Sequence, residues 1–91
     1  MSKITVNSME VEEGWEFDVV VSDDDSETKH KVTMSKVYYN KLGTDTLPDE
    51  IVKKSFEFLL DRESKEMILS EFNIEVIAKY FPEFSDEARG Y

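Results

Sequence analysis

The order of hydrophobic patterns along the chain predicts an α+β fold, in which an N-terminal antiparallel three-stranded meander packs on three to four C-terminal helices. Residues 3–34 alternate apolar and polar side chains with a period of two, and from residue 35 the spacing changes to that of helices. Strands followed by helices are typical of an antiparallel sheet with helices over one face. Because 91 residues suffice for one modest core, we expect a single domain over residues 1–84 and a mobile tail over residues 85–91.

Three stretches of the first half have the alternating pattern of strands. In the middle strand, apolar side chains at every second position share one face: Trp15, Phe17, Val19 and Val21. The next strand repeats the pattern with His30, Val32 and Met34. The polar run SDDDSE over residues 22–27 is typical of the hairpin tip between them. The first strand, over residues 3–11, changes its apolar phase half-way, so we expect a bulge near Asn7 and Ser8 that keeps its apolar residues on one face.

The second half begins with capping residues that predict two helices. Ser35 is expected to cap a short helix that ends at Gly43. A longer helix is expected to begin at Thr46 or Leu47, with Pro48 in its first turn, where the missing N–H costs no hydrogen bond. The apolar residues of this longer helix cover a wide arc: Ile51, Val52, Phe56, Phe58, Leu59 and Leu60.

Two further helices are expected before the C-terminal tail. The first would begin at Ser64 and place four apolar side chains in the core: Met67, Ile68, Leu69 and Phe72. The second would be capped by Asn73 and ended by Pro82.

The composition excludes several classes of function. The absence of cysteine excludes disulfides, thiolate catalysis and cysteine metal sites. The net charge of −10 disfavours direct binding to nucleic acids and to anionic membranes and favours a basic protein partner, although an acidic surface that only keeps the chain soluble is the simpler explanation. No apolar run approaches the roughly 18–20 residues of a membrane span, and the first residues lack the apolar region of a signal peptide, so we expect a cytoplasmic protein.

Acidic residues are concentrated in the first two strands and their turns, which makes this region the candidate binding face. Residues 10–27 hold nine acidic residues and no Lys or Arg, whereas residues 28–44 hold four lysines and no acidic residue. Glu16 and Asp18 are expected to face Lys29 and Lys31 across the hairpin. The remaining acidic residues have no such partners and form the candidate site for a basic protein: Glu10, Glu12, Glu13, Asp23, Asp24, Asp25 and Glu27.

The hairpin tip also resembles part of a calcium-binding loop, because Asp23, Asp25 and Glu27 alternate as oxygen donors. An EF-hand loop needs Gly at its sixth position and Glu at its twelfth. These positions are occupied by Thr28 and Met34. We therefore expect no metal site, with weak attraction of divalent ions to the exposed carboxylates as the alternative.

No pattern indicates catalysis, so we expect neither catalytic residues nor a cofactor. His30 is the only histidine, no Gly-x-Ser-x-Gly turn presents a nucleophile, and the three glycines are isolated. Arg62 is expected between two helices, close to Asp61, Glu63 and Glu66. An ion pair that fixes this corner explains Arg62, and a contact to an anionic ligand is the alternative.

The stretch SFEFLLDRESKEMILSEFNIEVIAKYFPEF, residues 55–84, resembles a family of short, uncharacterised prokaryotic proteins. These proteins have a charged β-rich first half followed by a second half of the form SFxFLLxRE…IL…F…VI…YFPE. The resemblance is carried by Phe56, Phe58, Leu59, Leu60, Arg62, Glu63, Ile68, Leu69, Phe72, Val76, Ile77, Tyr80, Phe81, Pro82 and Glu83. It implies a prokaryotic origin and brings no assigned activity or site residues.

Together these observations predict a small acidic, non-enzymatic protein-interaction module. One alternative is a nucleic-acid mimic that inhibits a basic nuclease or DNA-binding protein. The other is a small-ligand binder or enzyme with a pocket near Arg62 and His30. The identity of a partner and the oligomeric state stay open at this point.

Overall fold

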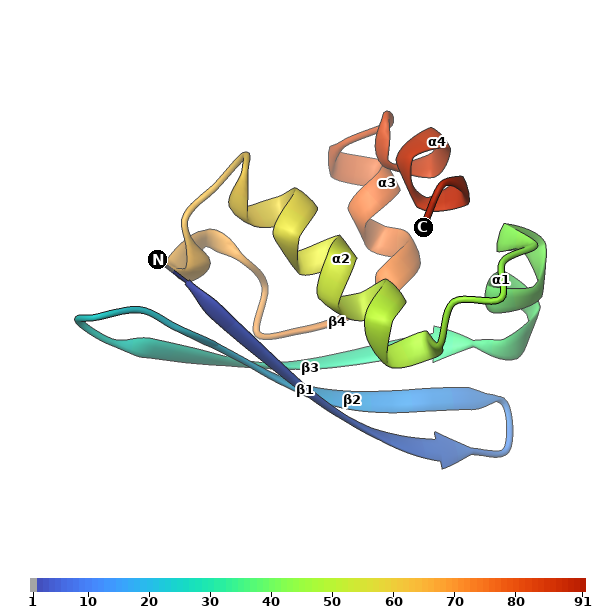
Figure 1. The fold of residues 1–91 in the computed structure, drawn as a ribbon, viewed down its shortest axis with the longest axis horizontal. Coiled ribbons are helices and arrows are strands. Elements are labelled where there is room, and N and C mark those ends of the chain that lie inside the picture. The colour runs from blue at the N-terminus through green and yellow to red at the C-terminus, as the bar shows by residue number, and fades with distance from the viewer. Residues whose placement is uncertain (1) are drawn as a thin grey trace.

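The computed structural model describes residues 2–91 and contains a four-stranded sheet with helices over one face (Figure 1). Strands β1 (Lys3–Val11), β2 (Gly14–Ser22) and β3 (Glu27–Ser35) form an antiparallel meander, and the short strand β4 (Glu71–Asn73) pairs in parallel with β3. The α-helices are α1 (Lys36–Leu42), α2 (Pro48–Leu60), α3 (Ile77–Tyr80) and α4 (Phe84–Arg89), and the 3₁₀ turns are η1 (Lys65–Met67) and η2 (Ile74–Val76). The α+β class and the three-stranded meander are confirmed.

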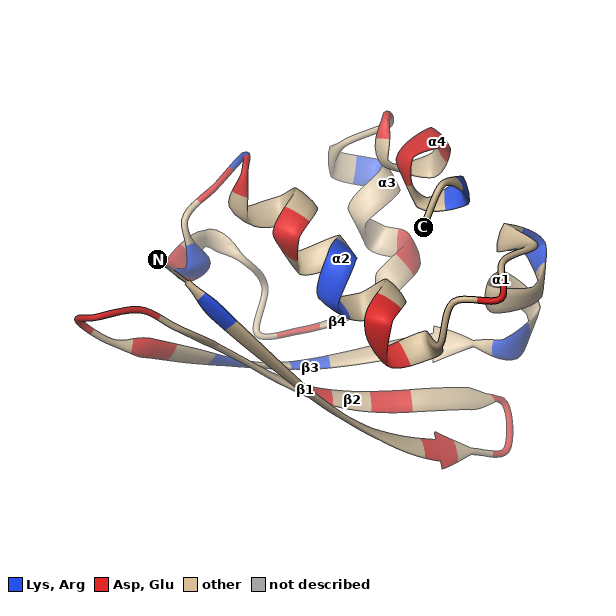
Figure 2. Cartoon of the chain, in the orientation of Figure 1, with Lys and Arg blue, Asp and Glu red and all other residues tan. Residues whose placement is uncertain are grey.

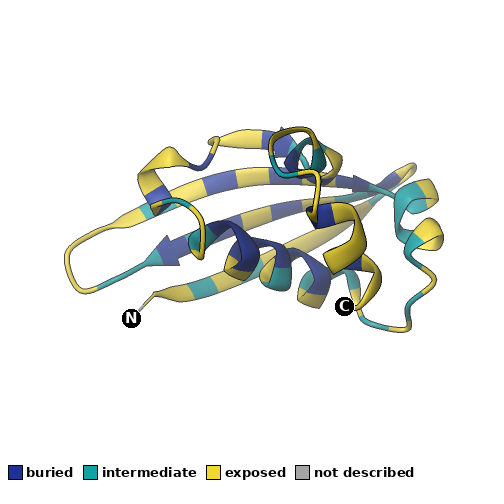
Figure 3. Ribbon diagram, turned by 90° about the horizontal axis from the view of Figure 1, so that it is seen from above, coloured by how far each residue is buried: buried dark blue, intermediate teal, exposed yellow. Residues whose placement is uncertain are grey.

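The core lies between the sheet and the helices. The inner face of the sheet contributes side chains that are at most 1% exposed: Phe17, Val19, Val21, Val32 and Met34. Helix α2 adds Ile51, Val52, Phe56, Phe58 and Leu59, all at most 5% exposed. Figure 3 shows how buried and exposed positions alternate along the strands. The period-two pattern and the apolar arc of the long helix therefore identified the core residues of the sheet and of α2, apart from Trp15 and Leu60, which are only partly buried.

The pairing of β1 with β2 corrects the expected bulge. The register is continuous from Lys3 opposite Ser22 to Val11 opposite Gly14, so no residue is inserted near Asn7. Without a bulge, the apolar side chain of Met9 lies on the outer face of the sheet and is 60% exposed. The helices cover the other face of the sheet, so Met9 stays in contact with solvent (Figure 1).

The helix boundaries follow the expected caps. The Ser35 hydroxyl accepts a hydrogen bond from the Tyr38 N–H, and Gly43 has the left-handed φ of 63° that ends α1. Helix α2 has Leu47 as its N-cap and Pro48 in its first turn. The sequence predicts these helix ends because each of them depends only on residues that are neighbours in the chain.

The helix expected from Ser64 is wrong. Residues 65–67 form the turn η1, and the following residues run extended into β4. The backbone N–H of Lys31 donates to the carbonyl of Ser70 at 2.7 Å, which starts the pairing of β4 with β3. This pairing satisfies backbone groups at the edge of β3 and overrides the local preference for a helix. Asn73 acts as a cap, as expected, since its side chain accepts from the Glu75 N–H at the start of η2.

The C-terminal residues form a packed helix in place of the expected tail. Phe84 and Ala88 in α4 are 0% exposed. The Tyr91 ring packs against Phe84 at a centroid distance of 6.1 Å, and the Tyr91 carbonyl accepts hydrogen bonds from the hydroxyls of Thr44 and Thr46. The apolar residues 84, 88 and 91 are spaced to share one face of a helical turn, which explains why this segment is held against the rest of the chain.

Candidate functional site

The predicted acidic residues do not lie in one patch. Glu12 and Glu13 form the turn between β1 and β2, with Glu10 near it, whereas residues 23–27 form the opposite end of the β2–β3 hairpin (Figure 2). Because β2 spans nine residues, the two groups are about 30 Å apart at the usual rise of a strand. The acidic residues therefore form two separate turns, with the length of the sheet between them.

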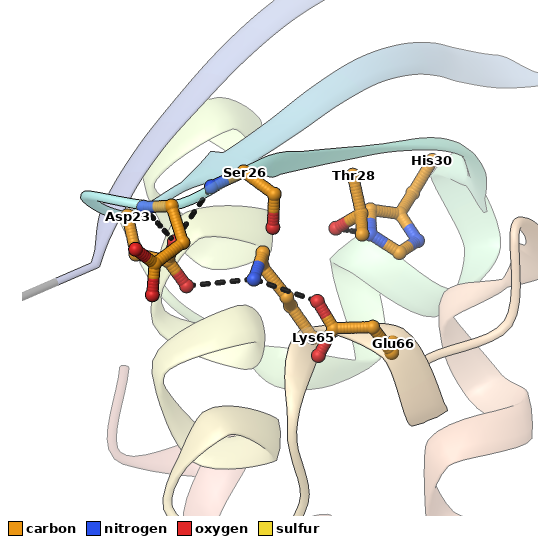
Figure 4. Close-up of polar contacts among 7 residues, drawn as sticks. Asp23, Ser26, Thr28, His30, Lys65 and Glu66 are labelled. Atoms are coloured by element: carbon orange, nitrogen blue, oxygen red, sulfur yellow. Dashed lines mark hydrogen bonds and ion pairs between the residues drawn. The ribbon is translucent and has the colours of Figure 1, made fainter.

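One of these residues, Asp23, takes part in a partly buried polar contact with Lys65 (Figure 4). Its Oδ1 accepts the N–H groups of Asp25 at 2.9 Å and Ser26 at 3.0 Å, and its Oδ2 accepts a hydrogen bond from Lys65 Nζ at 2.6 Å. The Lys65 side chain is only 8% exposed and also pairs with Glu66 at 2.6 Å.

These contacts shift the pKa values of the groups that make them. The hydrogen bond from Lys65, followed by those from Asp25 and Ser26, lowers the pKa of Asp23 to about 2. The hydrogen bonds of Lys65 to Asp23 and Glu66 raise the pKa of the Lys65 amine. Asp23 thus attaches the hairpin tip to η1 and is occupied by the fold.

Glu10 also has a partner within the chain. Its carboxylate lies 3.0 Å from Lys36 Nζ, in a pair exposed to solvent. An exposed pair of this kind contributes little to stability. Five of the seven predicted residues have no ion pair within residues 2–91 and are exposed: Glu12, Glu13, Asp24, Asp25 and Glu27.

The outer face of the sheet carries a mixture of charges. The register places Asp18 opposite Lys31, as predicted, and Lys31 opposite Glu71 on the other side. The other predicted pair is not formed, since Glu16 lies opposite Thr33. Alternating charges across the strands leave this face without a dominant sign.

Arg62 packs against the protein at the end of α2. Its guanidinium lies 3.6 Å from the centroid of the Phe58 ring and donates to the Phe58 carbonyl at 3.0 Å. Its Nε is 3.6 Å from a carboxylate oxygen of Glu83, in the segment that precedes α4. These contacts favour the interpretation of Arg62 as a corner residue, with Glu83 as its partner in place of the expected Asp61 or Glu66.

His30 is buried, with 4% of its surface exposed, and both ring nitrogens contact protein groups. Nδ1 lies 2.7 Å from the Leu69 carbonyl, and Nε2 lies 2.8 Å from the Thr28 hydroxyl. Because a carbonyl only accepts, Nδ1 carries a hydrogen and donates it to Leu69, and Nε2 forms the second hydrogen bond with the Thr28 hydroxyl. His30 therefore connects β3 to the segment that leads into β4.

An apolar groove lies where the end of α2, η1, β4 and α3 meet, with a volume of about 330 Å³. Its floor consists of side chains that are at most 9% exposed: Leu59, Ile68, Phe72 and Ile77. Its rim carries three exposed apolar side chains: Met67 (68% exposed), Leu69 (46%) and Tyr80 (66%). Glu63 is the one charged residue of the lining. We call this feature the apolar groove.

The sequence does not predict the groove, because its pattern places Met67 and Leu69 on a helix with their side chains in the protein core. In the structure Ile68 points into the core, and its two neighbours point outward. The signal was present in the run of three consecutive apolar residues, since an extended segment cannot bury all three on one side. Exposed apolar groups gathered around a concave surface are typical of binding sites.

The segment that surrounds the groove is acidic. Residues 61–83 contain six acidic and three basic residues. Two of the three basic residues are engaged, Arg62 with Glu83 and Lys65 with Asp23 and Glu66. The lining of the groove thus carries one charge, the negative charge of Glu63, within a segment that is acidic as a whole.

Comparisons of the chain with protein-family models, with curated proteins and with solved structures found no match. The family resemblance of residues 55–84 stays a prediction that rests on its motif. Within residues 2–91, no group of three or more His, Cys, Asp or Glu side chains is arranged to hold a metal ion. The helices of the same region are too short or too polar to cross a membrane.

Proposed function

We propose that the chain is a small, non-enzymatic binding module that recognises a basic protein partner through the apolar groove. The observation that carries this proposal is the cluster of Met67, Leu69 and Tyr80, which stay exposed around a concave apolar floor. Exposing three large apolar side chains together costs solvation free energy that a partner would recover. A partner buries these groups, and the charge of −10 attracts a basic one.

The groove supports binding more than it supports catalysis. A single carboxylate, Glu63, lines an otherwise apolar surface. General acid–base or nucleophilic chemistry usually combines several polar groups within hydrogen-bond reach of one another.

The two other functions that the sequence suggested receive less support. A nucleic-acid mimic needs carboxylates in a continuous phosphate-like series, and the exposed acidic residues lie at opposite ends of a hairpin. A ligand site at Arg62 would need a guanidinium that is free to bind an anion, and this one contacts Phe58 and Glu83. The acidic turns would act mainly by steering a basic partner at long range.

The test is capture of partners from lysate of the source cells by the tagged parent and two matched variants. Met67→Asp places a charge at the groove rim, and Leu47→Asp places the same charge at a site of equal exposure outside the groove, since both residues are 68% exposed. We expect a basic protein that is retained by the parent and by Leu47→Asp and is lost with Met67→Asp. Binding of that protein, once purified, is then measured by calorimetry. Identical sets of captured proteins for all three baits would contradict the proposal.

A further inference from the structure

We propose that the occupant of the apolar groove is an amphipathic helix with lysine or arginine beside its apolar stripe, and that Glu63 determines this specificity. The inference rests on the proposed function and adds to it the class of partner segment. It follows from the lining of the groove, from its size and from the charges around it.

The lining favours a helix over an extended peptide. Nine of the ten lining residues are apolar or aromatic, and Glu63 is the tenth. An extended peptide would bring backbone N–H and C=O groups against side chains that offer few hydrogen bonds, and each unpaired group would carry a desolvation cost. A helix satisfies its own backbone and presents side chains only, as in other grooves that bind amphipathic helices.

The size of the groove fits a few side chains. Its volume of about 330 Å³ lies near the lower end of the range of small-molecule pockets, roughly 300–1,000 Å³. Side chains at positions i, i+3 or i+4, and i+7 of a helix would enter it, while the thioether of Met67 adjusts to their shape.

The charges select a cationic occupant. A second copy of this chain, also at −10, would be repelled, as would an anionic membrane or a fatty acid. Glu63 is partly buried in the lining and has no ion pair within residues 2–91, so its carboxylate is free to accept hydrogen bonds from an ammonium or guanidinium group. A basic residue at the edge of a helical apolar stripe meets this requirement.

The test uses fluorescence anisotropy with three labelled peptides, each about 18 residues long so that a helix can form. The first peptide contains leucine and lysine in amphipathic helical order, the second has glutamate in place of lysine, and the third has the composition of the first in scrambled order. The proteins are the parent, Glu63→Gln, Met67→Asp and Leu47→Asp. Glu12→Gln is the matched control for Glu63→Gln, because it removes the same charge at the β1–β2 turn. Thermal melting establishes that each variant is folded.

We expect the leucine–lysine helix to bind the parent, Leu47→Asp and Glu12→Gln equally. Binding should weaken about tenfold with Glu63→Gln and be lost with Met67→Asp. The glutamate peptide and the scrambled peptide should bind much more weakly to every protein.

Three results would overturn the inference. Equal binding of the scrambled peptide would show that long-range attraction alone holds the cationic probe. Loss of binding with Met67→Asp, but none of the expected weakening with Glu63→Gln, would leave the groove as a binding surface and remove Glu63 as its selector. No difference among the folded variants would reject the helix as occupant, and the capture experiment with Met67→Asp would then decide separately whether the groove binds a protein.

Discussion

Phe56→Ala should strongly destabilise the protein and Met67→Ala should hardly change its stability, although the sequence assigns both residues to the core. Phe56 is 0% exposed, with its ring 5.3 Å from the His30 ring and 6.0 Å from the Phe72 ring, measured between centroids. Phe56→Ala removes a fully buried aromatic side chain and leaves a cavity, which typically costs about 3–5 kcal/mol. A chain of this size has a total free energy of unfolding of roughly 5–14 kcal/mol, so the loss is a large part of it. Met67 is 68% exposed, and Met67→Ala should change the free energy of unfolding by less than about 0.5 kcal/mol.

Urea denaturation followed by circular dichroism measures both variants. The midpoint should fall strongly for Phe56→Ala with an unchanged slope, and it should stay at the parental value for Met67→Ala. A parental midpoint for Phe56→Ala would refute the assignment of α2 to the core. A large loss for Met67→Ala would show that the rim of the groove supports the fold and would weaken the argument that it is free for a partner.

Three further predictions concern the hairpin tip, the start of β2 and the C-terminal helix. The pKa of Asp23 is lowered in the folded state from 3.8 to about 2. Its contacts therefore stabilise the fold above pH 4, and this stabilisation is lost as the pH falls from about 4 to 2. Asp23→Asn should remove this part of the acid dependence, measured as the melting temperature against pH. Gly14→Ala should destabilise the protein by about 1–3 kcal/mol in urea denaturation, because a Cβ at this position collides with the backbone carbonyl of Met34. A parental free energy of unfolding would show that β2 and β3 move apart at this point without destabilising the fold. Phe84→Ala should cost about 3–5 kcal/mol by the same measurement, since Phe84 is 0% exposed, whereas a mobile C-terminal segment would make the change neutral.

Features that depend on neighbouring residues could be predicted from the sequence. The alternation in β2 and β3 indicates a sheet with one covered face, and the cap at Ser35 and the first-turn position of Pro48 depend on residues within the same turn. The same reasoning failed where distant residues decide the structure. The contact that orients the segment before β4 joins His30 to the carbonyl of Leu69, which are 39 positions apart. No local pattern contains the information that β3 has a free edge to be paired.

The candidate site was missed for the same physical reason. Acidic residues that are close in the sequence were expected to form one surface, but a strand as long as β2 carries its two turns to opposite ends of the sheet. Conversely, the residues around the apolar groove come from α2, η1, β4 and α3 and converge only in the folded chain. Asp23 shows a further limit, because its partner Lys65 is 42 residues away and turns an apparent surface carboxylate into a structural one.

The apolar residues around the groove differ in whether the fold requires them. Pairing β4 with β3 satisfies backbone hydrogen-bonding groups at the edge of the sheet, and Ile68 and Phe72 are buried in the core. Core packing therefore explains why these two positions are apolar. Met67, in η1, and Leu69, in the segment before β4, are exposed to solvent, where polar side chains would serve the fold equally well. Tyr80 reaches the same rim from α3, a separate element with its own packing. Three apolar side chains from different segments, none of them required to close the core, thus meet at one hollow. Packing of the core does not require this arrangement, and the proposed recognition of an apolar surface on another molecule would explain it.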